Sequence, residues 1–323
     1  MIYELAEKAE NAVKNNCDAY EIYVDESNVI ELESEQNELN FAKEEIEQGI
    51  GIRVIKDNRI GFAFTSNLDK ISETANQAIE NTKLTKKDEN YAFAEKEKVV
   101  DVKKVYDKKF NDLDLGEAVD LLKSLIATAG DSGCEVTGSG FSASEGRSLI
   151  LNSNGVSIED KGTGFEAALS VTIQKEGKIA TAYNSQSSRF FDLDGEKLAN
   201  EVCDLAKSSL DTTPIETNDY DVVLDYYAAT GLLQTFISAF NGENVMRGRS
   251  ILNGKIGSEI ANPTISIVDN PLLEKGMYTS KCDGEGSVSK KTDLIKDGVL
   301  NSFIYDIYTA NKVNGKTTSN GYR

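Results

Sequence analysis

Two stretches of this chain share a pattern that limits its possible folds more than any other feature. Residues 52–64 (IRVIKDNRIGFAF) align without a gap with residues 171–183 (VTIQKEGKIATAY), and both alternate apolar and polar residues around a polar turn. Such alternation predicts antiparallel hairpins. Apolar residues at helical spacing precede and follow each hairpin. We therefore predict two units of helix, strands and helix, about residues 1–84 and 114–210, and interpret them as an internal repeat. In the first unit the alternating runs are residues 20–24, 29–33, 38–46, 50–55 and 60–64.

The rest of the chain completes the predicted domain organisation. Residues 85–113 are charged and lack periodicity, which is typical of a connector. The sequence predicts an α+β fold with an N-terminal domain at residues 1–215, built on an antiparallel sheet, and a β-rich C-terminal domain at residues 216–323 with an early buried helix. The chain ends at Arg323 without a closing strand or a capping helix, so we expect this second domain to be incomplete.

The composition argues against several classes of function. The chain has no histidine and a net charge of -19. Without histidine there is no Ser-His-Asp triad, no Cys-His dyad and no zinc site with imidazole ligands. The acidic charge disfavours direct binding to nucleic acid, because that binding depends on Lys and Arg that neutralise phosphates. The chain lacks both an export signal and an apolar run of the roughly 20 residues that span a bilayer, which predicts a cytoplasmic protein without membrane contact.

Two further motifs predict ordinary structure rather than a site. Residues 138–143 (GSGFSA) have the GxGxxA form of a dinucleotide fingerprint, but strand-like alternation resumes where that fingerprint requires a helix. The four cysteines lie far apart and form no CxxC pair. This spacing predicts reduced thiols and gives no indication of a zinc or redox site.

The C-terminal domain contains two sets of candidate contact residues. Arg247 and Arg249 suit either bidentate binding of a peptide carboxylate or a structural salt bridge. Asp283 and Glu285 lie in a glycine-containing loop beside Cys282, which leaves open a hydrolase that uses the thiol or the carboxylates.

The start of the C-terminal domain has the frame of a metal site without its ligands. Residues 221–242 predict a buried strand that leads directly into a helix. In a metallohydrolase such a helix carries two histidines on one face with a glutamate between them. The chain resembles the TldD/PmbA family, also called modulators of DNA gyrase, in this segment and in motifs spread over most of its length: DAYEIYV at 18–24, GIGIRV at 49–54, RGRSIL at 247–252, DGEG at 283–286, LIKDGVL at 294–300, YTANK at 308–312 and SNGYR at 319–323.

The resemblance implies a zinc-dependent peptidase of two subunits. One subunit of the family carries an HExxxH helix and a later cysteine ligand, whereas its PmbA or TldE paralogue lacks them. By resemblance, the motif positions in this chain are Thr235, Phe236 and Ala239. None of these side chains supplies a zinc imidazole or a general base. We therefore predict no catalytic residue, no metal and no cofactor in this chain, and expect zinc in the partner subunit.

The leading hypothesis is a PmbA/TldE-like subunit that pairs with a TldD-like, zinc-bearing paralogue and acts with it on unfolded peptides. Arg247, Arg249, Asp283 and Glu285 are the candidate contacts to the peptide or to the partner. The alternative is a non-enzymatic binding or regulatory protein, with a homodimer as one possible form. That protein would act on a partner from a toxin-antitoxin or gyrase-related system.

Overall fold

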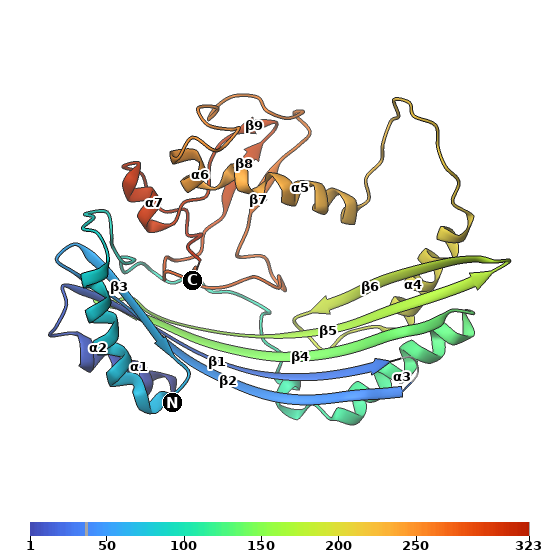
Figure 1. Ribbon diagram of the computed structural model, residues 1–323, viewed down its shortest axis with the longest axis horizontal. Coiled ribbons are helices and arrows are strands. Elements are labelled where there is room, and N and C mark those ends of the chain that lie inside the picture. The colour runs from blue at the N-terminus through green and yellow to red at the C-terminus, as the bar shows by residue number, and fades with distance from the viewer. Residues whose placement is uncertain (36–37, 323) are drawn as a thin grey trace.

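One long, curved antiparallel sheet forms the frame of the molecule (Figure 1). The computed structural model describes residues 1–35 and 38–322. The sheet has six strands in the order β3-β2-β1-β4-β5-β6, so the two units meet where β1 pairs with β4. The strands are β1 (Ala19–Glu35), β2 (Glu38–Lys56), β3 (Arg59–Thr65), β4 (Glu135–Asn152), β5 (Ser157–Lys175) and β6 (Lys178–Ser188).

Two pairs of helices cover the convex face of this sheet, one pair at each end (Figure 1). One pair buries an apolar core that includes Ile22, Ile52 and Leu149. The other pair buries a separate core that includes Phe165 and Leu169. The first pair is α1 (Ile2–Val13) with α2 (Ile71–Asn81), and the second is α3 (Leu115–Asp131) with α4 (Gly195–Ser208).

The two units have the same order of elements, α1-β1-β2-β3-α2 and α3-β4-β5-β6-α4. Both aligned hairpins close through two-residue turns with positive φ, 51° at Asp57 and 58° at Asn58 in the first, 52° at Glu176 and 78° at Gly177 in the second. These angles are those of the type I′ turn that suits the twist of paired strands. The α+β fold with an antiparallel sheet is confirmed, while a common origin of the two units stays a prediction.

The connector, residues 85–113, has an irregular conformation apart from the short 3₁₀ helix η3 (Lys108–Asp112). It is nonetheless fixed to the sheet, because the Nδ2 of Asn152 donates to the Ala94 carbonyl at 2.8 Å. Residues 138–143 lie wholly inside β4, so the predicted strand alternation is confirmed at this motif and no helix begins there.

The C-terminal region, residues 216–322, lies on the concave side of the sheet (Figure 1). Its small sheet has the order β7-β8-β9, and the last two strands are joined by a turn at Asp297 and Gly298. The predicted first strand, residues 222–225, is irregular. The elements of this region are α5 (Tyr226–Phe240), α6 (Gly242–Met246), β7 (Ile267–Asp269), β8 (Thr292–Lys296), β9 (Val299–Leu300) and α7 (Ile307–Lys312).

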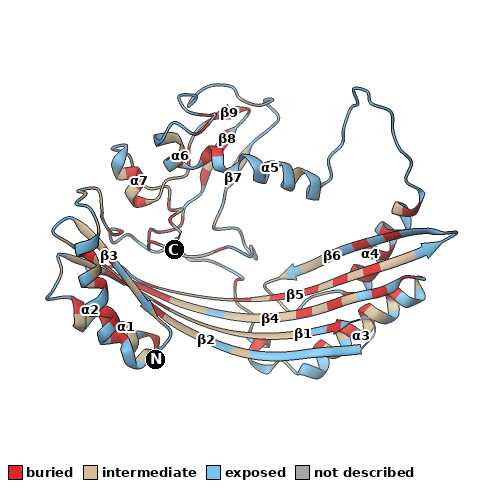
Figure 2. Ribbon diagram, in the orientation of Figure 1, coloured by how far each residue is buried: buried red, intermediate tan, exposed pale blue. Residues whose placement is uncertain are grey.

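The prediction that the early helix is buried is wrong for this structure. In α5 only Ala239 and Phe240 are buried, whereas Phe236 is 44% exposed and Ile237 is 58% exposed. Figure 2 shows most of α5 in the pale blue of exposed residues. Apolar spacing shows which face of a helix can be buried, but not whether another element covers that face. In the part of the chain that the structure describes, no helix has the length and apolar character needed to cross a membrane.

Candidate functional site

The positions that resemble the zinc motif lie along α5. The Thr235 hydroxyl donates to the Leu232 carbonyl at 2.7 Å, which is a bond within the helix. A motif of the form HExxxH that begins at Thr235 ends at Phe240, so the assignment of its last ligand to Ala239 is one residue short. Neither Ala239 nor Phe240 has a side-chain atom that can bind zinc. Among the described residues, no group of three or more His, Cys, Asp or Glu side chains could hold a metal. The side chains of this helix therefore do not fit a zinc ion.

The two candidate arginines follow α6. The ion pair of Arg247 is within this segment and does not involve the acidic loop. Arg247 Nη2 is 2.6 Å from Glu243 Oε1, one helical turn earlier, and both side chains are half exposed. Arg249 is exposed. Of the two alternatives for Arg247, the structure contains the salt bridge. Use of either arginine to bind a peptide stays a prediction.

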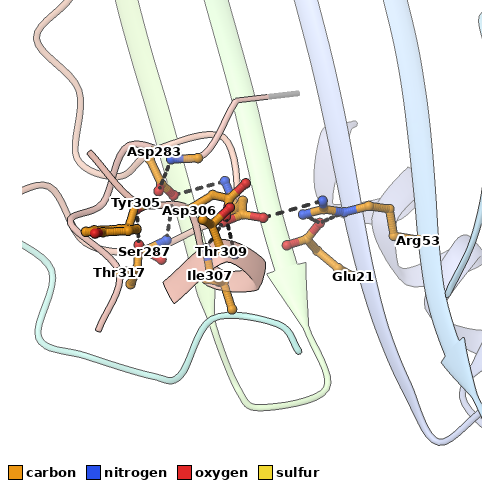
Figure 3. Close-up of polar contacts among 11 residues, drawn as sticks. Glu21, Arg53, Asp283, Ser287, Tyr305, Asp306, Ile307, Thr309 and Thr317 are labelled. Carbon is orange, nitrogen blue, oxygen red and sulfur yellow. Dashed lines mark hydrogen bonds and ion pairs between the residues drawn. The ribbon is translucent and has the colours of Figure 1, made fainter. Parts of the chain in front are cut away.

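Asp283 lies at the seam where the C-terminal region meets the sheet (Figure 3). Glu285 follows it in the same loop. Asp283 Oδ1 accepts hydrogen bonds from the backbone N–H groups of Glu285 and Ser287, both at 2.9 Å, and its Oδ2 accepts one from Gly321 at 2.7 Å. Burial still outweighs these donors and raises the pKa of Asp283. Because both oxygens are engaged in holding the loop, the geometry favours a structural role for this carboxylate over a hydrolytic one.

Glu285 connects this loop with the sheet through Arg53, whose side chain is partly buried. Its Oε2 accepts the Ile307 N–H at 2.8 Å, and its Oε1 lies 3.7 Å from Arg53 Nη1. Arg53 is closer to Glu21, with Nη2 at 2.6 Å and Nε at 2.7 Å from Oε1. One guanidinium thus lies between two carboxylates. Burial raises the pKa of Glu285 to about 7, so this seam can take up a proton near neutral pH.

A second arginine attaches the C-terminal region to the sheet near strands β5 and β6. Arg189, just after β6, donates to the Thr163 carbonyl on β5 at 3.1 Å. It also donates to the carbonyl groups of Gly276 at 3.0 Å, Met277, and Thr279 at 3.2 Å. Burial lowers the pKa of Arg189. This fan of bonds holds the loop at residues 276–280 above the concave face of the sheet.

A cavity of about 390 Å³ lies between this loop and the sheet. Its floor is made of small residues, because Ser27, Gly146 and Gly162 lie opposite one another on β1, β4 and β5. The carboxyl group of Asp25 lies one row away on the same face. Burial and the nearby Glu47 raise the pKa of Asp25. The concave face therefore offers an open, polar hollow beside the C-terminal region, with charged side chains of both signs in its lining.

Sequence reasoning identified Asp283 and Glu285 but missed their partners. Glu21 on β1 and Arg53 on β2 lie opposite each other in the sheet. Both are far from the loop in the sequence. The sequence contains one indication of these partners, namely a charged residue between two apolar neighbours in a strand, such as Arg53 between Ile52 and Val54. This pattern indicates that the charged side chain points away from the apolar core, but it does not indicate which element covers that face of the sheet.

Three family models match this chain, and together they cover most of it. They are PmbA/TldA metallopeptidase domain 1 at residues 20–82, the central domain at residues 108–210 and the C-terminal domain at residues 217–323. The chain belongs to this PmbA/TldD family of metallopeptidases.

Individual relatives agree with this assignment. An uncharacterized protein of Methanocaldococcus jannaschii is 37% identical over 283 residues, which are 86% of this chain and 65% of that protein. The metalloprotease PmbA of Escherichia coli O157:H7 is 24% identical over 98% of this chain and 72% of its own length. The crystal structure of TldE from Thermococcus kodakarensis superimposes with a TM-score of 0.86 at 25% identity, covering 99% of this chain and 73% of that one.

Proposed function

We propose that this chain is the subunit without a metal site of a cytoplasmic, two-subunit zinc metallopeptidase that degrades or processes unfolded peptides. The proposal rests on α5, which corresponds by resemblance to the zinc helix of the family and has Thr235, Phe236 and Phe240 at the motif positions, in a chain without histidine. Zinc in such an enzyme polarises the scissile carbonyl and activates water. We place that ion in a TldD-like paralogue.

The surface of α5 supports a role in contacts rather than in chemistry. The helix has no charged residue from Tyr226 to Phe240, and most of its apolar side chains are exposed. An exposed apolar surface of this kind suits a partner subunit or an unfolded peptide. The chain then contributes a wall and the position of the peptide, while the partner contributes the reaction.

The test is cleavage of an unstructured peptide by this chain, by the zinc-bearing paralogue and by their mixture. We expect activity in the mixture that a chelator abolishes and that zinc restores. A mixture that contains the paralogue with its motif glutamate replaced by glutamine is the matched control, because assembly is kept while the general base is lost. Stoichiometric zinc in the isolated chain, together with cleavage without the partner, would overturn the proposal.

The alternative remains a non-enzymatic binding protein that acts on a toxin-antitoxin or gyrase-related partner. A mixture that assembles but never cleaves, or a chain that forms a stable homodimer and ignores the paralogue, would favour it. Sedimentation of the chain with and without the paralogue separates these outcomes.

A further inference from the structure

The outer edge of β2 is open along most of its length. β3 pairs with β2 only from Ile50 to Lys56. In the described residues, no strand pairs with the outer side of β2 from Glu38 to Gly49, and most side chains there are exposed. Such an edge presents unpaired backbone N–H and C=O groups, to which an extended chain can add as a further strand.

A second cavity, of about 680 Å³, opens where β3 ends and this free edge begins. Residues 46–49 of β2 form one wall, and Ser66, just after β3, forms another. Asp25 lines both this cavity and the one beneath the loop at residues 276–280. A strand added to β2 would follow the line of β3 and pass through this space.

The concave face beside the edge is acidic. Glu47 lies opposite Ser27, and Gly49 lies opposite Asp25, so the carboxyl groups of Asp25 and Glu47 are in adjacent rows of the same face. Glu45 is in the next row. Lys43 is the one basic residue between Glu38 and Gly49, and it already forms an ion pair with Glu45. The charge of this edge therefore remains negative.

We propose that the β2 edge binds an extended, lysine- or arginine-bearing peptide segment as an additional strand, with basic side chains directed to Asp25, Glu45 and Glu47. Backbone hydrogen bonds supply binding that is independent of sequence, and the carboxylates supply the preference for basic residues. A second copy of β2 suits this edge less well, because it would place acidic side chains opposite acidic ones. This inference rests on the proposed function, which identifies the bound segment as a peptide substrate. The binding itself requires only the isolated chain.

The test is fluorescence anisotropy of the isolated chain with a short, labelled peptide that alternates lysine and valine. We expect saturable binding. Two peptides are matched controls: one has glutamate in place of lysine, and one carries N-methyl groups on alternate backbone amides, so that strand pairing is blocked while charge is kept. We expect both to bind at least tenfold more weakly.

Variants of the chain test whether the peptide binds at the β2 edge. Replacing Asp25 with Asn and both Glu45 and Glu47 with Gln should weaken binding of the lysine peptide about tenfold, as expected for several charge pairs at a partly exposed surface. Glu44→Gln removes one charge from the opposite face of the same strand and should change the affinity less than twofold.

Each outcome decides the proposal. It is overturned if the lysine peptide does not bind, if the N-methylated peptide binds equally well, or if the triple variant, shown to be folded by circular dichroism, keeps the parent affinity. The peptide series needs no variant, so it decides the question even if the triple variant fails to fold. Because no partner and no metal are present, failure here is distinct from failure of cleavage in the mixture.

Discussion

Glu21 on β1 and Arg53 on β2 lie directly opposite each other, with Arg53 Nη2 2.6 Å from Glu21 Oε1. The Glu21 side chain is fully buried, and the same guanidinium is 3.7 Å from Glu285 Oε1 in the C-terminal region. One cation therefore compensates two carboxylates that come from opposite sides of a seam. This charge is one of the links that attach the C-terminal region to the sheet.

Loss of Arg53 should be costly. We expect Arg53→Met to lower the free energy of unfolding by about 3–5 kcal/mol, because it removes the cation that compensates two buried carboxylates. The control is Arg247→Met, which breaks an exposed pair with Glu243 and should cost less than about 1 kcal/mol. Urea unfolding measures both. Equal effects of the two substitutions would show that the seam does not depend on this cation.

The seam should also make stability depend on pH through Glu285. Its pKa is about 7 in the folded chain, so the folded state keeps its proton after the unfolded chain has lost it. The resulting stabilisation is complete below about pH 4.5 and is lost as pH rises to about 7, a total on the order of 3 kcal/mol.

Glu285→Gln should remove this contribution. The glutamine can still accept the Ile307 N–H, so we expect the variant to gain stability relative to the parent as pH rises across this range. Unfolding of both chains at several pH values measures the difference. Parallel pH profiles would contradict the expectation.

The close approach of two loop segments requires glycine at position 321. A Cβ atom there would lie 2.4 Å from Cγ of Glu285, whose carboxyl group is held in place by Ile307 and Arg53. We expect Gly321→Ala to destabilise the chain by about 1–3 kcal/mol, as for overpacked sites.

A second glycine offers a matched control for this effect. Gly130 lies in α3, and a Cβ atom there would meet nothing within 4 Å. Gly130→Ala should therefore leave stability unchanged or raise it by up to about 1 kcal/mol, because alanine favours helix. Thermal unfolding of both variants makes the comparison. A loss of stability only at Gly130 would contradict the packing at Gly321.

The four cysteine thiols should react in two phases. Cys134 and Cys203 are buried, and burial raises the pKa of Cys203 to about 12, whereas Cys17 and Cys282 are partly exposed. Because the thiolate is the reactive form, an aromatic disulfide reagent should modify the exposed pair in the native chain and the buried pair only after unfolding. Single Cys→Ser variants at positions 17 and 282 assign the early phase. Modification of all four thiols at one rate would be inconsistent with this core.

Local signals were enough to predict the hairpins but not the full strands. The turns at Asp57 and at Glu176 follow from short polar sequences between alternating runs. The runs at residues 20–24 and 29–33 are one strand in the structure, because the polar residues between them remain extended where neither face of β1 is fully covered. Alternation disappears when both faces are polar, although the backbone pairing continues.

The partners of a buried charge could not be predicted from the sequence. Asp283 and Glu285 were recognised within their loop, but Arg53 is far away in the chain and is brought to them only by the register of β1 with β2 and by the docking of the C-terminal region. The exposure of α5 was missed for the same reason. Both depend on which surfaces meet, and periodicity carries no information on that.

The separation of the two apolar cores has a consequence for how the molecule loses its structure. Each helix pair protects its own end of the sheet, and the stretch between them, which includes Asp25 and Gly146, is polar and open. The chain should therefore open in two cooperative blocks joined through β1 and β4, rather than as a single unit. Native-state hydrogen exchange should show two groups of slowly exchanging amides, each with its own opening free energy, and one shared value would rule this out.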